Sequence, residues 1–228
     1  SDAPPDQVGY RAVVTALSDL AAMGAQPRAI TLALTLPEAN ESWVREFSRG
    51  IEQATLAYEV ELLGGDTTRG PLTISVTVMG ALPKGEALTR SGAQPGDKVY
   101  VSGHTGDAAA ALTVMNGQWP GHRQHKEYLL NRFYRPTART DLGKQLRGIA
   151  SSAIDISDGL LADAAHICER SKVAINIHSQ QLSLSAALLS VPDEAQAKSW
   201  ALTGGDDYEL LFTVAPENTD KVPEYCVC

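Results

Sequence analysis

Helix-like and strand-like patterns alternate along almost the whole chain, and this alternation limits the possible folds more than any other feature. The first part of the chain shows two helical and three strand patterns, over residues 8–24, 40–58, 29–36, 60–63 and 72–82. Asp6 and Asn40 are the expected N-caps of the two helices. Such a mixture indicates a layered α+β or α/β architecture.

A stretch rich in glycine, proline and polar residues, Pro83 to Gly96, interrupts the alternation and is the best candidate for a linker. Beyond it, strand patterns recur at residues 98–102, 152–156, 173–177 and 208–214, with helical patterns between them. We therefore predict two domains. Residues 1–88 form an N-terminal α+β domain, and residues 89–228 form a layered α/β C-terminal domain.

Charge and cysteine usage exclude several classes of protein. The 27 acidic residues against 19 basic ones give a net charge of −8, which is unlike the clustered positive charge of a nucleic-acid-binding protein. No apolar run approaches the roughly 18–20 residues of a membrane span. The three cysteines form no CxxC pair, so we expect reduced thiols in a cytoplasmic protein.

Five aspartates stand out because each lies beside apolar sequence or flexible backbone. Asp19 lies in an apolar helix, Asp66 and Asp206 follow glycine pairs, and Asp155 and Asp158 flank the end of a strand. Mg²⁺ prefers oxygen ligands and is often shared between carboxylates and substrate phosphates. Glycines also let the backbone approach a phosphate closely. The pattern indicates a candidate site for magnesium and a phosphate compound.

Simpler interpretations remain open for each residue on local grounds. Asp19 could be a surface residue, Asp66 and Asp206 could be ordinary turn residues, and Asp155 and Asp158 could cap the following helix. Arg90, in a Thr-Arg-Ser-Gly turn, could clamp a phosphate or could be an exposed loop arginine. The P-loop, protein-kinase, GxSxG and HExxH motifs are all absent.

The same residues lie in five motifs that together resemble one family. The motifs are LSDLAAMGA (17–25), LLGGDTTRGP (62–71), LTRSGAQPGD (88–97), IDISDGL (154–160) and TGGDDYEL (203–210). Their order and spacing are similar to the thiamine-monophosphate kinase family, within the aminoimidazole ribonucleotide synthetase superfamily. The resemblance spans residues 17–210, which is nearly the whole chain.

The resemblance implies that ATP phosphorylates thiamine monophosphate to thiamine diphosphate. It implies direct transfer assisted by several Mg²⁺ ions, with no covalent nucleophile on the protein. It further implies a homodimer that forms through the N-terminal domain, with ATP in the cleft between the domains. Neither nucleic acid nor a membrane is an expected partner.

The resemblance also implies residue roles. Asp19, Asp66, Asp155 and Asp158 match metal ligands. The expected ATP contacts are Gly65, Asp66, Arg90 and Ser157. Asp206 matches a substrate contact at a position where the family has Glu, so its side chain is one methylene shorter.

Family members have an upstream segment with a further metal-binding aspartate, and a downstream aromatic residue near the substrate. We therefore expect both ends of this sequence to be incomplete. Two alternatives stay open. The protein could be another ATP-using enzyme of the superfamily, such as a purine-precursor or selenophosphate synthetase, or a nucleotide-binding homologue without catalytic activity.

Overall fold

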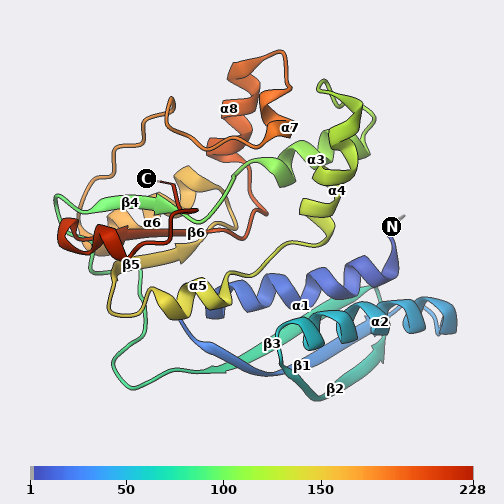
Figure 1. The fold of residues 1–228 in the computed structure, drawn as a ribbon. Helices are drawn as coiled ribbons and strands as arrows, with labels where there is room; N and C mark the ends of the chain where they lie inside the picture. Colours follow the sequence, from blue (N-terminus) through green and yellow to red (C-terminus); the bar gives the residue numbers. More distant parts are fainter. Residues whose placement is uncertain (1–2, 228) are drawn as a thin grey trace.

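The computed structural model describes residues 3–227 and begins with a layer of two helices on a three-stranded sheet (Figure 1). The elements are α1 (Pro5–Ala22), β1 (Gln26–Leu36), α2 (Glu41–Ala57), β2 (Glu61–Arg69) and β3 (Thr73–Ala81). The strand order is β2-β1-β3, with β1 parallel to β2 and antiparallel to β3. The two helices and one sheet face form a core that includes Val13, Leu17, Ile30, Phe47 and Ile51.

The other side of this sheet, which we call the open face, is not covered by α1 or α2. Along β3, Ile74, Val76 and Val78 pack into the helical core, so Ser75 and Thr77 between them belong to the open face. All nine residues of β2 are exposed. The first sheet thus has one covered and one open face.

The second part of the chain carries another three-stranded sheet, surrounded by helices. Its elements are β4 (Lys98–Val101), α3 (Asp107–Met115), η1 (Arg123–His125), α4 (Lys126–Tyr134), α5 (Thr140–Gln145), β5 (Ala150–Asp155), α6 (Leu160–Ser171), α7 (Ala186–Leu189), α8 (Glu194–Thr203), β6 (Leu210–Val214) and η2 (Pro216–Lys221). The strand order is β4-β6-β5, and both pairs are antiparallel. The central strand β6 is buried along its whole length. Together the two layers confirm a two-domain α+β fold.

Helix α1 connects the two layers. It packs against α2 and β3 on one side and contacts α4, α5 and β5 on the other, and Figure 1 shows it running between the two parts of the molecule. A hydrogen bond also crosses between the parts, in which Ser18 donates to Asp155, and at the start of the linker the Leu88 N–H donates to the Met23 carbonyl. Residues on α1 are therefore placed to meet residues of the second sheet.

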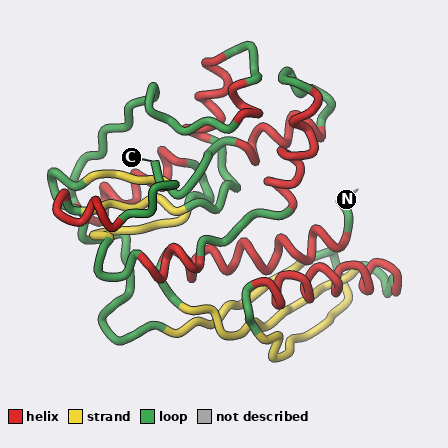
Figure 2. The backbone as a smooth tube through the Cα atoms, viewed as in Figure 1, coloured by secondary structure: helices red, strands yellow, loops and turns green. Residues whose placement is uncertain are grey.

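Three local predictions were wrong. Asp6 does not cap α1: Pro4 is the N-cap residue and Pro5 begins the helix, because its fixed φ and missing N–H suit the first turn. The strand expected over residues 60–63 does not end there, since β2 runs from Glu61 to Arg69. Residues 173–177 form no strand; they belong to the long loop between α6 and α7, which Figure 2 draws in green. In that loop, side chains such as Ile175 pack on a core cluster without strand pairing.

Asn40 does cap α2, by accepting a hydrogen bond from the Trp43 N–H at 3.0 Å. Among residues 3–227, no helix is both long and apolar enough to span a membrane.

Candidate functional site

A cleft of about 400 Å³ lies where α1 meets the second sheet. Its wall is formed by Ala12, Thr15, Ala16, Asp19, Ile74, Val76, Asp155, Ser157 and Tyr208. The structure therefore brings Asp19, Asp155 and Ser157 together, although the first two are far apart in the sequence. Helical periodicity explains the α1 wall, because residues 12, 15, 16 and 19 share one side of the helix.

Asp155 is the best-defined carboxylate of this cleft. It ends strand β5, only 6% of its surface is exposed, and its Oδ2 accepts a hydrogen bond from Ser18 Oγ at 2.8 Å. Burial raises its pKa above the usual aspartate value, the Ser18 hydrogen bond opposes this rise, and the negative charge of Asp19 adds to it. Two carboxylates that repel each other and offer only oxygen donors fit a hard divalent cation such as Mg²⁺.

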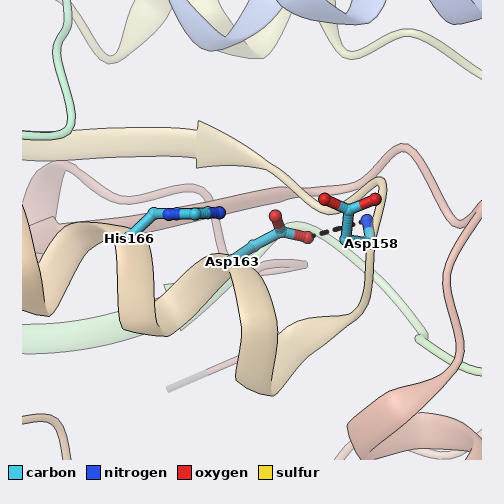
Figure 3. A group of neighbouring side chains, drawn as sticks. All are labelled: Asp158, Asp163 and His166. Atoms are coloured by element: carbon cyan, nitrogen blue, oxygen red, sulfur yellow. Dashed lines mark hydrogen bonds between the residues drawn. The ribbon is translucent and has the colours of Figure 1, made fainter.

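The loop after β5 carries Ser157 and Asp158. The Asp158 side chain is exposed and is not part of the cleft wall. All three backbone N–H groups of the loop, at Ser157, Asp158 and Gly159, donate to one oxygen of Asp163, at 3.0, 3.1 and 3.1 Å. Asp158, Asp163 and His166 lie close together (Figure 3). Each offers one possible metal-ligand atom, and these atoms lie within 4.8 Å of one another. Sequence reasoning missed Asp163, although an acidic residue in the first turn of a helix is a recognisable signal.

Asp206 lies in a second loop, between α8 and β6, whose contact with Arg11 of α1 connects the two domains. Its Oδ1 accepts hydrogen bonds from Arg11 Nη2 at 2.6 Å and from the Tyr208 hydroxyl at 2.9 Å. Its own N–H donates to the Ser157 carbonyl at 2.9 Å, and a Cβ on Gly205 would lie 2.5 Å from that same oxygen. This loop and the Ser157–Gly159 loop are therefore interlocked. Neither Arg11 nor Tyr208 was among the site residues predicted from the sequence.

Asp66 lies away from the cleft. Asp66 pairs in register with Ala33 of β1, and Ala33 pairs in turn with Ser75 of β3. Ala33 and Ser75 are both exposed. Thr68, two residues on and hence on the same face, shares a hydrogen bond of 2.9 Å with Thr35 across the strands. Asp66 is thus on the open face, whereas the cleft uses β3 side chains of the covered face. Its Oδ1 accepts a hydrogen bond from the Thr67 N–H at 2.8 Å.

Gly65 and Arg90 have structural surroundings of their own. A Cβ on Gly65 would lie 1.7 Å from the Leu32 carbonyl oxygen, so the close approach of β1 already requires glycine there. Arg90 is exposed on the linker, beside β5: the neighbouring Thr89 carbonyl accepts from the Ala153 N–H, and the Arg90 carbonyl accepts from Ser171 Oγ. The Arg90 guanidinium does not line the cleft.

A buried network of charged residues supports the Asp206 loop from behind. Glu209, of which 1% is exposed, pairs with Arg139 Nε at 2.7 Å and with Arg132 Nη2 at 3.0 Å, and these arginines hold its pKa below the usual value in spite of its burial. Asp207 accepts from the Gly106 N–H at 2.7 Å, and burial raises its pKa to about 7. Residues 207 and 209 thus anchor a loop in which Asp206 binds Arg11 and Tyr208 lines the cleft.

Comparison with known proteins identifies relatives of this chain. The N-terminal domain model of AIR synthase related proteins matches residues 1–82, and the C-terminal domain model of the same proteins matches residues 94–227. The thiamine-monophosphate kinase of Haemophilus influenzae is 45% identical over 218 residues, which cover 96% of this chain and 66% of the relative. The Salmonella typhimurium enzyme of the same name is 46% identical, with coverage of 95% and 67%. The chain thus spans about two thirds of the length of these relatives.

Solved structures agree with this comparison. The thiamine-monophosphate kinase of Stenotrophomonas maltophilia K279a has a TM-score of 0.90 and 45% identity, and the match covers 95% of this chain and 70% of that one. A ThiL protein solved with AMPPCP and TMP has a TM-score of 0.88 and 37% identity, with coverage of 95% and 71%. The hydrogenase maturation protein HypE of Escherichia coli shares the fold alone, at 20% identity and a TM-score of 0.79, with coverage of 94% and 67%.

Proposed function

Because this chain belongs to the thiamine-monophosphate kinase family of AIR synthase related proteins, we propose that the protein transfers the terminal phosphate of ATP to thiamine monophosphate, giving ADP and thiamine diphosphate. The observation that carries the proposal is the convergence of Asp19, Asp155 and Ser157 on one cleft between the domains. These residues come from two of the five family motifs. The relative solved with AMPPCP and TMP supports the same pair of substrates.

The cleft suits direct phosphoryl transfer. The acceptor is a phosphate oxygen that is already ionised, so the protein does not need a strong general base. Among the described residues, the cleft wall offers the hydroxyl groups of Thr15, Ser157 and Tyr208 but no histidine or lysine that could activate them. The residues would therefore act by positioning the two phosphates, and cations held by the carboxylates would balance the phosphate charge.

We assign magnesium to the carboxylates of this region. Asp19 and Asp155 would bind Mg²⁺ in the cleft, with Asp158 on the adjoining loop as a further ligand. When bound, the ions neutralise the charge that keeps the two phosphate groups apart. The Ser18 hydrogen bond holds the Asp155 carboxylate at the end of β5, so one ligand is oriented before any ion arrives.

The interlocked loops suit the two substrates. Ser157 would contact ATP, with Arg90 reaching its phosphates from the linker. Asp206 would contact thiamine monophosphate, directly or through a water molecule, because its side chain is one methylene shorter than the glutamate of the family. Arg11 and Tyr208 hold the Asp206 carboxylate in place for this contact.

We further propose a homodimer in which a second copy covers the open face. That face is uncovered within one chain, and the exposed strand β2 lies at the edge of the sheet. Asp66 and Gly65 lie on β2 and are remote from the cleft of their own chain. We therefore assign their metal and ATP contacts to the cleft of the partner subunit, across the dimer interface.

The proposed compartment is the cytoplasm. ATP is the phosphate donor, and Cys168 and Cys226 are free thiols, which suits a reducing environment. The domain division at residue 88 likewise stays a proposal; it falls between the stretches that the two domain models match.

The decisive experiment is an assay of the full-length protein with ATP, Mg²⁺ and thiamine monophosphate. We expect ADP and thiamine diphosphate in equal amounts, and no product when thiamine replaces the monophosphate. ATP bound or hydrolysed without thiamine diphosphate would replace this proposal with another ATP-using activity of the superfamily. No nucleotide binding at all would contradict both.

A further inference from the structure

Asp163 holds the backbone of the Ser157–Gly159 loop through a single atom. Asp163 lies in the first part of α6, and only 2% of its surface is exposed. Its Oδ2 accepts from three consecutive N–H groups, at distances of 3.0 to 3.1 Å. Figure 3 shows the carboxylate reaching back from the helix toward the loop, where a dashed line joins it to the Asp158 nitrogen.

Contacts that do not involve Asp163 also restrict the loop. Gly159 has a φ of 127°, which favours glycine, and a Cβ there would lie 2.9 Å from the Thr203 carbonyl oxygen. The Ser157 carbonyl accepts the Asp206 N–H on the opposite side of the loop. The carbonyl side of the loop is therefore held by the second loop and its N–H side by Asp163.

We propose that Asp163 is a positioning residue for phosphoryl transfer. It does not line the cleft, but it fixes the directions in which Ser157 and Asp158 leave the backbone toward the nucleotide and the metal. This inference rests on the proposed function. The three N–H groups occupy Oδ2 and leave only the second carboxylate oxygen for an ion, and we assign the residue to supporting the metal ligands of the loop.

The first test measures amide hydrogen exchange, which does not depend on activity. In Asp163→Ala, we expect the amides of residues 157–159 to exchange about tenfold faster or more, because each loses a charge-assisted hydrogen bond. The amide of Ile167, further along α6, should keep its protection. Asp193→Ala is the matched control: Asp193 caps α8 by accepting from the Ala195 and Gln196 N–H groups, and its loss should not affect the loop. Unchanged exchange at residues 157–159 in Asp163→Ala would overturn the proposal.

The second test measures the Mg²⁺ concentration that gives half-maximal activity in the full-length enzyme. We expect Asp163→Ala to raise it by about 10- to 100-fold, the usual effect of removing a group that orients a metal ligand. Asp163→Asn should raise it less, because its amide oxygen can still accept hydrogen bonds. Asp193→Ala should leave it unchanged.

His166→Ala separates positioning from direct ligation. Because positioning needs no ligand atom from His166, this variant should keep the wild-type Mg²⁺ dependence. An equal rise in His166→Ala and Asp163→Ala would overturn the proposal in favour of a metal site built from both residues. A wild-type protein without kinase activity would contradict the proposed function instead, and the exchange measurement would then decide the role of Asp163 alone.

Discussion

Asp155 is a residue whose proposed function conflicts with its effect on stability. Its pKa is raised by burial and by the charge of Asp19, so above that pKa its ionised form destabilises the folded protein. Asparagine is uncharged and can still accept the Ser18 hydrogen bond. We expect Asp155→Asn to raise the free energy of unfolding by about 1 kcal/mol near pH 8, as measured by urea denaturation without Mg²⁺.

The same variant should lose kinase activity by about 100-fold or more, because it lacks a charged ligand for the metal. Ser18→Ala serves as a control, since it removes the hydrogen bond but leaves the carboxylate. It should lower both stability and activity. An Asp155→Asn protein that is active, or that is less stable than wild type, would contradict this account of the cleft.

Asp207 should make the protein less stable as the pH rises, whereas a carboxylate with a lowered pKa makes a protein more stable as the pH rises. With a pKa of about 7 in the folded state, it retains a proton that the unfolded chain has already released above about pH 4. The folded state therefore binds more protons, and the stability from this group is lost as the pH rises from about 4 to 7. We expect the free energy of unfolding to fall by roughly 2 kcal/mol between about pH 5 and pH 8.

Asp207→Asn is the variant that tests this pH dependence. Asparagine keeps an oxygen for the Gly106 N–H but does not titrate, so its unfolding curve should be flatter over the same range. Parallel curves for the two proteins, measured by urea denaturation at several pH values, would show that another group is responsible.

At the scale of single elements, strand β2 depends on a glycine for its pairing. A methyl group on Gly65 would overlap the Leu32 carbonyl oxygen at 1.7 Å, so β1 and β2 would have to separate. We expect Gly65→Ala to lose about 1–3 kcal/mol of stability, or more, in the absence of nucleotide. Thr67→Ala, at an exposed position of the same strand, is the control. If both variants melt at the wild-type temperature, the strand does not need glycine there.

The sequence predicted elements best where the signal is local. Helix α2 was expected over residues 40–58 and is found over Glu41–Ala57, because its apolar spacing and the Asn40 cap are both local signals. Residues 173–177 carry a strand-like alternation, but a strand also needs a partner, and this segment pairs with no strand in residues 3–227. The strand expected over residues 60–63 is longer than predicted for a related reason: pairing with β1 extends it through the glycines.

The site residues show the same difference between local signals and long-range contacts. The motifs identified Asp19, Asp155 and Ser157, and the structure brings them together in the cleft. Arg11 and Asp163 carry no motif of their own. Arg11 finds its partner Asp206 195 residues away, and Asp163 acts through the backbone, so its role depends on loop geometry that side-chain patterns do not encode.

At the scale of the whole molecule, the position of Asp66 on the open face predicts sites shared between two subunits. Asp66→Asn and Asp155→Asn should each inactivate a dimer of identical chains. A mixed dimer with one chain of each kind would contain one site with both changes and one site with neither. We expect it to have about half of the wild-type activity.

This complementation is measured by co-expressing the two variants with different affinity tags and assaying the doubly purified dimer. A second mixed dimer, with both substitutions in one chain and none in the other, should have little activity because each site then carries one change. If only this second dimer is active, Asp66 works within its own chain. A monomer in sedimentation experiments would contradict the shared site altogether.

The contact between Arg11 and Asp206 has a consequence for biosynthesis. Arg11 lies in the first helix and Asp206 near the end of the second domain, so their loop cannot close while the ribosome is still making the residues between them. The first domain can fold earlier, but during that time Arg11 lacks its carboxylate partner, and the cleft wall lacks Asp155, Ser157 and Tyr208. A nascent chain therefore gains the complete cleft in one late step, after residues 206–209 have left the exit tunnel.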